Sequence, residues 1–534
     1  MRGGLRSAVI LIAAGAVTAF AIHAAAQSPA GQLRQSAYLK ASNPGTGDHF
    51  ACGTALDGHA GIGISISGDG NTMAVGAPHE SSNAPGVNGD QNNDNSYSSG
   101  AVYVFTRAAN GAWTQQAYLK ASNPGDGDDF GHVVSLSADG NTLAVSAYYE
   151  SGGSKGLNGD QKNRSIPQSG AVYVFTRAAS RWSQQAYIKA SNPGEAGEGD
   201  DFGDGDQFGF SLSLSDDGNT LAAGATAEDS GFADNQADNS KMSAGAVYVF
   251  VRNGANWVQQ AYVKPSNIDA GDQFGYSVSL NADGNVLAIG SYDEGGSARV
   301  VDGPQDNMRN GSGAVYIFAR AAGGWKQTNY LKAANAEGGD SFGVSVALSD
   351  DGNTVAIGSL DEDCLASGIN SAPCDNDRVS DTSTGAAYVF VRTGNTWVQQ
   401  AFFKQSNTKT RGDWFGARLA MSGDGNTMVS GATLEDGGSR GINGNQEDRT
   451  KVDSGAAYVF TRTGTSWKQI AYVKSSNSDA GDEFGGSLAL SRDGKTIAIG
   501  ARAEDSNARG VNGNQDDNSL QDAGAAYVFS VGPS

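Results

Sequence analysis

Seven residues, Ser99-Gly100-Ala101-Val102-Tyr103-Val104-Phe105, form the stretch that determines the fold of this chain. The same pattern returns six more times at intervals of 68 to 75 residues, with its glycine at Gly170, Gly245, Gly313, Gly385, Gly455 and Gly524. A unit of this length cannot bury a core alone, so consecutive units must stack on one another. We therefore expect the 534 residues to form an array of one repeated supersecondary unit.

Each repeat contains the pattern of four short β-strands. In the second copy, alternation over Val134–Leu136 precedes a tight Asp139-Gly140 turn and a return strand at 142–147. A long polar loop separates these from third and fourth strands at 170–177 and 184–190. Seven such repeats predict an all-β, seven-bladed β-propeller with four antiparallel strands per blade. The alternatives are a β-solenoid, which has shorter and more uniform coils, and an array of β-sandwiches, which would need linkers.

The two ends of the chain favour a closed ring. A fourth-strand sequence at about 33–42 has no first three strands before it, and the last copy ends on a third strand at 524–529. We expect the N-terminal strand to complete the seventh blade, although it carries Leu33 where six fourth strands carry tryptophan. A closed ring leaves no open blade edge for a second chain, so a monomer is expected.

The first 26 residues have the pattern of a secretory signal peptide. Arg2 and Arg6 precede an apolar run over 8–22 and small residues before a cleavage point near Ala26-Gln27. The run is shorter than the roughly 20 residues of a membrane span. We expect the mature chain, 27–534, to be secreted or periplasmic and to have no membrane span.

The net charge limits the classes of partner, and the cysteine content limits how disulfides can stabilise the chain. The formal net charge is −21, which argues against nucleic acid as a partner and is compatible with cations or with simple solubility. Cys364 and Cys374 lie in one loop and are expected to form a disulfide in an exported protein, which leaves Cys52 over.

The repeat resembles a known family. Phe274-Gly275, Leu287-Ala288-Ile289-Gly290 and Gly313-Ala314-Val315-Tyr316-Ile317-Phe318 are similar to the FG-GAP repeat of integrin α-chain N-terminal propellers and their bacterial relatives. The resemblance covers essentially the whole mature chain and implies an integrin-α-like propeller with a role in cell adhesion. It departs at the first turn of each blade, where Gly68-Asp69-Gly70-Asn71 replaces the family's Asp-rich calcium loop. Calcium takes six to eight oxygens, so we interpret these segments as hairpin turns. In blade one, an insertion over 51–60 also separates Phe50 from its glycine.

Acidic loops are the candidate binding elements. The loop after the second strand and the connection into the next blade emerge on one face of a propeller. Candidate binding residues on this loop face are Asp90, Asp160, Asp272, Asp340 and Asp482. A local carboxylate cluster in blade three, with Asp201, Asp204 and Asp206, is the best calcium candidate. Such oxygen ligands suit Ca²⁺ or hydrogen bonds to sugars, although Asp, Asn and Gly are also what turns consist of.

Two further sets of residues have an alternative structural explanation. A glutamate follows every second strand and a lysine lies in every fourth strand, at Glu80, Glu150, Glu228, Glu294, Glu362, Glu435 and Glu504 and at Lys40, Lys120, Lys189, Lys264, Lys332, Lys404 and Lys474. Since catalytic residues are few and asymmetric, a structural role is favoured over a cation-binding ring. His49, Cys52, His59 and His79 of blade one, with His132 of blade two, are conceivable transition-metal ligands without a recognisable spacing.

No catalytic motif of the common hydrolase, metalloprotease or phosphate-binding types occurs in the sequence. We expect an exported, non-enzymatic binding or adhesion module that binds an extracellular protein or glycan through its loop face, with calcium as the candidate cofactor. The alternative is a carbohydrate-active enzyme, a glycosidase or lyase with acidic residues at the channel mouth. A purely structural envelope protein is the third interpretation.

Overall fold

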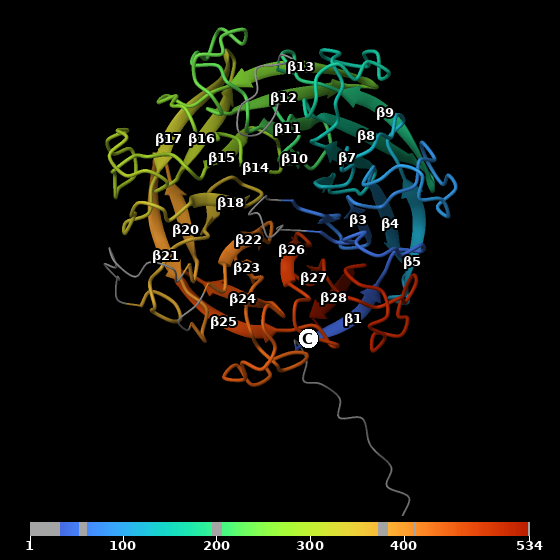
Figure 1. The fold of residues 1–534 in the computed structure, drawn as a ribbon. Helices are drawn as coiled ribbons and strands as arrows, with labels where there is room; N and C mark the ends of the chain where they lie inside the picture. Colours follow the sequence, from blue (N-terminus) through green and yellow to red (C-terminus); the bar gives the residue numbers. More distant parts are fainter. Residues whose placement is uncertain (1–31, 53–60, 195–204, 372–382, 409–411, 532–534) are drawn as a thin grey trace, which may run out of the picture.

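The computed structural model describes residues 32–52, 61–194, 205–371, 383–408 and 412–531. Within these residues the chain forms 28 strands in seven four-stranded antiparallel sheets and no helix. The sheets stand around a central axis like the blades of a propeller, with the first strand of each blade innermost (Figure 1). The predicted seven-bladed all-β architecture is confirmed. The signal-peptide segment lies outside the described residues.

The strands follow one order in every blade. The innermost strands are β2 (Ile64–Ile66), β6 (Val134–Leu136), β10 (Leu212–Leu214), β14 (Ser277–Leu280), β18 (Phe342–Leu348), β22 (Phe415–Met421) and β26 (Phe484–Leu490). The second strands are β3 (Thr72–Ala77), β7 (Thr142–Ala147), β11 (Thr220–Ala225), β15 (Val286–Ser291), β19 (Thr354–Ser359), β23 (Thr427–Ala432) and β27 (Thr496–Ala501). The third strands are β4 (Ala101–Arg107), β8 (Ala171–Ala178), β12 (Ala246–Asn253), β16 (Ala314–Ala321), β20 (Ala386–Thr393), β24 (Ala456–Thr463) and β28 (Ala525–Val531). The outermost strands are β5 (Trp113–Leu119), β9 (Arg181–Ile188), β13 (Asn256–Val263), β17 (Gly324–Leu331), β21 (Thr396–Phe403), β25 (Ser466–Val473) and, in blade seven, β1 (Leu33–Leu39).

The N-terminal strand closes the ring, as the sequence predicts. β1 pairs antiparallel with β28, with Tyr38 opposite Tyr527 and Leu33 opposite Val531. Leu33 also has a matching change in the neighbouring blade. In blade five, the outer-strand Gln400 accepts a hydrogen bond from Trp467 of blade six. Blade six has Ile470 in place of that glutamine, and the next blade has Leu33 in place of the tryptophan.

The Phe-Gly and Gly-Ala segments of the repeat meet between neighbouring blades. The Phe130 ring lies edge-on to Tyr173 of β8, with ring centroids 5.3 Å apart, while the Phe130 amide donates to the Ser99 carbonyl of the preceding blade. Gly100 has φ +79°, and a Cβ there would lie 2.0 Å from the Phe130 carbonyl oxygen. Glycine is therefore required at this position by both its backbone conformation and the close approach. This contact explains why the motif recurs in each repeat.

Blade one departs from the repeat at its entry. Phe50 keeps the usual backbone bond, donating to the Ala523 carbonyl at 3.0 Å, and Ala51 takes the place of the glycine with φ +65°. Ala51 donates to Gly76, as Gly131 donates to Ser146 in blade two. The insertion therefore follows Cys52 rather than Phe50, and residues 53–60 lie outside the described part.

Candidate functional site

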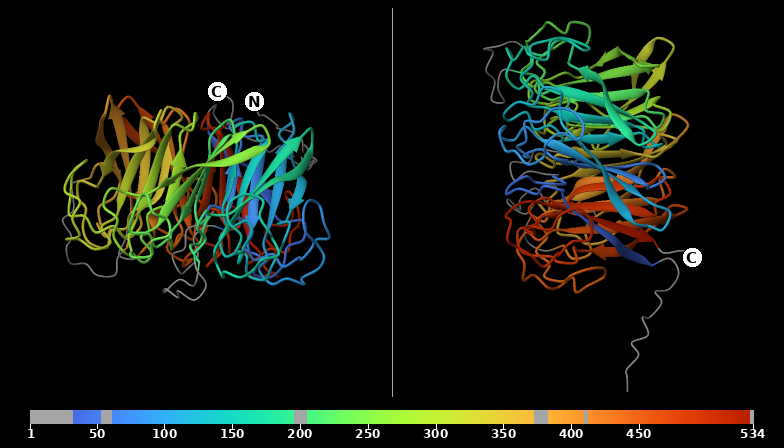
Figure 2. Two further views of the ribbon diagram at one scale, coloured as in Figure 1. Left: turned by 90° about the horizontal axis from the view of Figure 1, so that it is seen from above. Right: turned by 90° about the vertical axis from the view of Figure 1, so that its right-hand side faces the viewer.

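The loops after the second strands and the inter-blade connections gather on one face, as expected. The Lys120 amide, at the end of the outer strand β5, donates to the Gly86 carbonyl of the preceding long loop at 2.8 Å. Asn43, in the connection from blade seven, donates from Nδ2 to the Gln91 carbonyl at 2.9 Å. Figure 2 shows these loops collected on one side of the ring and the short hairpins on the other. We call the first side the long-loop face.

The repeated glutamates and lysines are buried and pair with each other. Glu150 Oε2 lies 2.8 Å from Lys189 Nζ, which also donates to Ser169 Oγ at 2.7 Å. Tyr187 donates its hydroxyl to Glu150 Oε1 at 3.3 Å. Six blades have this ion pair at 2.7 to 3.1 Å. The structural interpretation of the glutamate and lysine rings agrees with this burial, because paired and enclosed carboxylates cannot line an open channel mouth.

Blade five is the exception. Phe402 stands where other outer strands have a tyrosine, and Tyr388 of β20 donates to Glu362 Oε2 at 2.9 Å instead. Lys404 Nζ then bonds Thr384 Oγ1 at 2.6 Å and the Glu362 carbonyl at 3.3 Å, without an ion pair to the Glu362 carboxylate. Burial lowers the pKa of Lys404 to about 8.

The predicted loop-face aspartates fall into two groups. Asp272, Asp340 and Asp482 are buried beneath the face, where desolvation, with neighbouring carboxylates, raises each pKa to about 8. Asp90 and Asp160 are exposed on two different loops, where each accepts a backbone N–H two residues later at 3.0 Å. The structure does not bring the five together, and burial takes three of them out of reach of a ligand.

The candidate metal ligands do not form a metal-binding cluster among the described residues. Asp201 and Asp204 lie outside the described part, and Asp206 is buried. No group of three His, Cys, Asp or Glu side chains suited to a metal ion occurs in the part that the structure describes. The rings of His49 and His79 are in contact and tilted by 46°, with centroids 4.6 Å apart, and burial lowers the pKa of His49 to about 3. His59 lies outside the described residues, while the ring of His132 in blade two contacts that of Tyr148 at a tilt of 36°, with centroids 4.2 Å apart.

The cysteines are buried where they are described. Cys364 is disulfide-bonded, and its expected partner Cys374 lies outside the described residues. Cys52 is buried near the entry of blade one, and desolvation raises its thiol pKa to about 12.

The blades differ most at one strained position. The residue before each repeated phenylalanine has φ between 50° and 58° although none is glycine, and the seven are His49, Asp129, Gln207, Gln273, Ser341, Trp414 and Glu483. Non-glycine residues in this region are held there by their surroundings and are often functional. Their partners come from the ends of the second strands: Gln273 Nε2 donates to the Tyr292 hydroxyl at 3.2 Å, and Ser341 Oγ donates to Asp361 Oδ2 at 2.7 Å.

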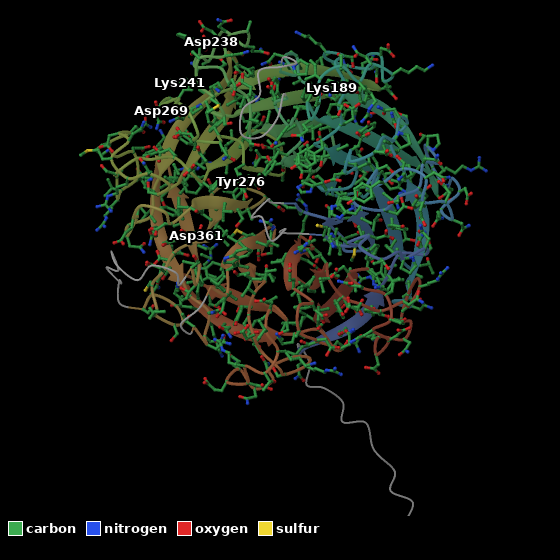
Figure 3. All side chains as sticks on the ribbon, viewed as in Figure 1. Lys189, Asp238, Lys241, Asp269, Tyr276 and Asp361 are labelled. Atoms are coloured by element: carbon green, nitrogen blue, oxygen red, sulfur yellow. The ribbon has the colours of Figure 1, made fainter. Side chains whose placement is uncertain are left out.

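An aromatic cluster lies at the same level. Tyr148, Phe210 and Tyr276 are buried together with Val344, Leu360 and Ala417, from five consecutive blades. Half-buried Tyr149, Tyr292 and Trp414 pack against this core. Tyr276 and Tyr292 have ring centroids 4.3 Å apart, and Tyr276 is drawn beside the central opening (Figure 3). We call these nine residues the channel-mouth cluster.

Sequence reasoning missed the channel-mouth cluster. Some of its members lie directly before or after the repeated Phe-Gly, and others lie just before the repeated glutamate. They come from blades that are far apart in the sequence. The sequence did contain a signal for the cluster. At these positions the side chains of the seven repeats differ in size and chemistry, whereas the neighbouring Phe and Glu are the same in all seven.

Backbone hydrogen bonds link all seven blades at the opposite face of the channel. One residue from each blade donates its amide to the carbonyl of the next at 2.8 to 3.2 Å, in a closed circle of Gly68, Ala138, Asp216, Ala282, Asp350, Gly423 and Arg492. The Arg492 guanidinium also forms ion pairs with Asp216 and, at 2.8 Å, with Asp350. Blade seven is thereby linked to blades three and five, and the channel-mouth cluster lies at the opposite end.

Comparison with known proteins identifies the repeat. The FG-GAP repeat matches at 113–175, 257–318, 325–390 and 467–529. Each match starts at an outer strand and ends within the next blade's third strand, so the sequence repeat is offset from the structural blade. No significant match is found among curated proteins. Among the described residues, no helix is long and apolar enough to cross a membrane.

The solved structures that match this chain share little sequence with it. A periplasmic gluconolactonase of Pseudomonas aeruginosa is 16% identical, with 84% of this chain and 98% of that chain covered and a TM-score of 0.43. A putative 6-phosphogluconolactonase of Bacteroides uniformis is 10% identical, with 77% and 85% covered and a TM-score of 0.44. The hydrazine synthase of Kuenenia stuttgartiensis is 12% identical, with 82% and 92% covered and a TM-score of 0.44.

Proposed function

Since the chain is a seven-bladed β-propeller that carries FG-GAP repeats, we propose that it is an exported, non-enzymatic binding or adhesion module. Its ligand site is the channel-mouth cluster on the long-loop face, and its ligand is a glycan. A protein ligand bound by the outer loops is the second candidate. Export follows from the sequence of residues 1–26.

The observation that carries the proposal is the contrast between a uniform frame and a non-uniform mouth. The contacts of the repeated phenylalanine recur in every blade, with Ala51 in place of the glycine in blade one, and the buried Lys–Glu pairs recur in six blades, so these features support the fold. At the mouth, the same backbone positions hold Gln273, Ser341 and Trp414 in neighbouring blades. A binding site needs such asymmetry, because a ligand without seven-fold symmetry cannot match seven identical side chains.

The chemistry of the mouth suits sugars. Half-buried Tyr149 and Tyr292 pack against buried Tyr148 and Tyr276, with ring centroids 3.8 and 4.3 Å apart, and half-buried Trp414 packs against the same cluster. Asp361 and the Gln273 amide stand beside them as hydrogen-bonding groups. Concave sites lined by aromatic rings with a few polar groups are typical of small-molecule recognition.

Glycan binding by the mature chain tests this proposal. A glycan array followed by calorimetry should give a ligand whose Kd rises tenfold or more in Trp414→Ala and Tyr292→Ala, a loss of about 1.4 kcal/mol. Tyr97→Ala is the matched control, because Tyr97 is an aromatic residue that is 76% exposed on an outer loop. If Tyr97→Ala abolished binding and the mouth variants did not, the outer loops would be the binding surface.

Two parts of the proposal need separate experiments. Calcium dependence is tested by a melting series with millimolar calcium against EDTA, since a ligand of the native state raises the melting temperature. The enzymatic alternative requires turnover of a polysaccharide that a single substitution abolishes. Asp361→Asn is the first substitution to make, because its carboxylate lies at the mouth beside Ser341.

A further inference from the structure

Arg418 occupies a position in β22 where the other blades have small or apolar residues. The equivalents on the other innermost segments are Gly63, Val133, Ser211, Ser277, Ser345 and Ser487. In blades three to five the serine hydroxyl donates to the next blade's Phe-Gly carbonyl, for example Ser345 Oγ to Gly416 O at 2.8 Å. Arg418 is only 3% exposed, so blade six places a guanidinium inside the channel wall.

The charge of Arg418 has no carboxylate partner in the described part of the chain. Nε donates to the Gly61 carbonyl at 3.2 Å and Nη1 to the Ala417 carbonyl at 2.6 Å, while buried Nη2 has no hydrogen-bond acceptor among the described residues. Among the described residues, the ionisable side chains near it are Tyr276 and Cys52, and neither of them is a carboxylate. A buried charge satisfied only by carbonyl groups is costly, since charges inside proteins are normally paired.

The guanidinium lines a cavity in the channel beneath the channel-mouth cluster. Ser211, Ser277, Ser345 and Tyr276 contribute to the same wall, and the cavity volume is about 30 Å³. That volume accommodates about two water molecules. It is large enough for a halide ion or a single carboxylate group and too small for a sugar ring. Ser487 Oγ, at the equivalent position in blade seven, is a second buried group without a partner.

We propose that Arg418 binds a small monovalent anion, a halide or a carboxylate group, inside the channel. The anion supplies the negative charge that the described residues around the guanidinium lack, and it accepts the hydrogen bond that Nη2 makes to none of these residues. Two sources have this chemistry: a free ion from solution, or the carboxylate of a larger molecule held at the channel mouth. With a free ion as its source, the site is independent of the proposed glycan binding, because a free ion needs no ligand at the mouth.

Melting temperatures at constant ionic strength test the site. Sodium methanesulfonate, whose anion is too bulky for the cavity, is replaced stepwise by sodium chloride, sodium formate or sodium glucuronate. We expect a saturable rise of a few degrees with chloride or formate if the source is a free ion. A rise with glucuronate alone would assign the site to the carboxylate of a larger ligand.

The matched variant is Arg418→Ser, which restores the residue of blades three, four, five and seven and should fold. It should lose the anion-specific rise, while Arg418→Lys should keep a weaker one. Arg492→Gln is the control, because Arg492 lies at the opposite end of the channel and already has two carboxylate partners. In crystals soaked in bromide, an anomalous peak should lie beside the Arg418 guanidinium. An absence of any anion-specific rise in the wild type, or an equal rise in Arg418→Ser, would overturn the proposal.

Discussion

Lys189 Nζ lies 2.8 Å from Glu150 Oε2, and neither side chain has any exposed surface. The pair joins the end of the outer strand β9 to the loop that follows β7, so it links the outermost strand of blade two to its long loop. Asn123, from the connection out of blade one, donates to Glu150 Oε1 at 3.1 Å. The buried pair is therefore part of a polar contact between neighbouring blades.

Removing one member of this pair should destabilise the protein strongly. Lys189→Met leaves the Glu150 carboxylate buried and unpaired, which we expect to cost about 3–5 kcal/mol in free energy of unfolding. Lys404→Met is the matched comparison, since Lys404 makes no ion pair with Glu362. Urea unfolding should show a clearly smaller loss for Lys404→Met. Equal losses would mean that the stem of the lysine, rather than its charge, supports the blade.

Stability should fall as the pH rises from about 4 to 8. Burial raises the pKa of Asp272, Asp340 and Asp482 from 3.8 to about 8, so the folded state holds their protons in a range where the unfolded state has released them. Unfolding then releases protons, and each carboxyl group removes at most about 1.4 kcal/mol of stability per pH unit within that window. Urea unfolding at pH 5 and pH 8 measures the difference.

The triple variant Asp272→Asn, Asp340→Asn, Asp482→Asn separates these groups from other causes. Asparagine resembles the protonated carboxyl group, so the variant should be nearly as stable as the wild type at pH 5 and should lose less stability by pH 8. Asp90→Asn with Asp160→Asn is the control, because both side chains are exposed. An unchanged slope in the triple variant would contradict the assignment.

The fold could be predicted from the sequence because its determinants are local and repeated. The turn at Asp139-Gly140 and the strand after Gly170 are each recognisable within ten residues, and seven copies remove the ambiguity of one. The closing strand was predictable because Tyr38 belongs to an unmatched fourth strand. The burial of Asp272 was not, because its turn sequence is typical of an exposed loop, while the following Phe274 is buried between blades.

The candidate site could not be predicted because it depends on contacts that exist only in the closed ring. Tyr148 and Tyr276 lie 128 residues apart in the chain and join one cluster through Phe210. Arg418 likewise donates to Gly61, across 357 residues of sequence. In a single repeat Arg418 is an ordinary strand position, and the aromatic residues are ordinary positions just outside the strands. Only a comparison of equivalent positions among the seven repeats would have indicated them.

The N-terminal strand should be indispensable. A chain that begins at Ser42 lacks β1 and Lys40, so Glu504 loses its buried partner at 2.8 Å and β28 becomes an open edge. We expect this chain to aggregate or to melt at a much lower temperature than a chain that begins at Gln32. A synthetic peptide of residues 31–42 in excess should raise its melting temperature by mass action. Two chains of equal stability would contradict the role of β1 in closing the ring.

A single substitution at the outer rim should stabilise the protein. In blades two, three, four and six the tryptophan Nε1 donates to a glutamine of the preceding blade at 2.9 to 3.0 Å. Trp397 Nε1 is buried without an acceptor, because Thr328 occupies the glutamine position. Thr328 is exposed, and its hydroxyl donates only to the Ile317 carbonyl at 3.1 Å, which solvent can replace in part. Thr328→Gln should therefore add up to about 1 kcal/mol by satisfying the indole N–H.

Thr328→Met is the matched control for that substitution, since its side chain has a similar length but no strong acceptor. Combining Thr328→Gln with Trp397→Phe should remove the gain, and the double-mutant cycle then gives the coupling energy between the two side chains. If Thr328→Met stabilised the protein as much as Thr328→Gln, the gain would come from apolar contact and not from the indole hydrogen bond.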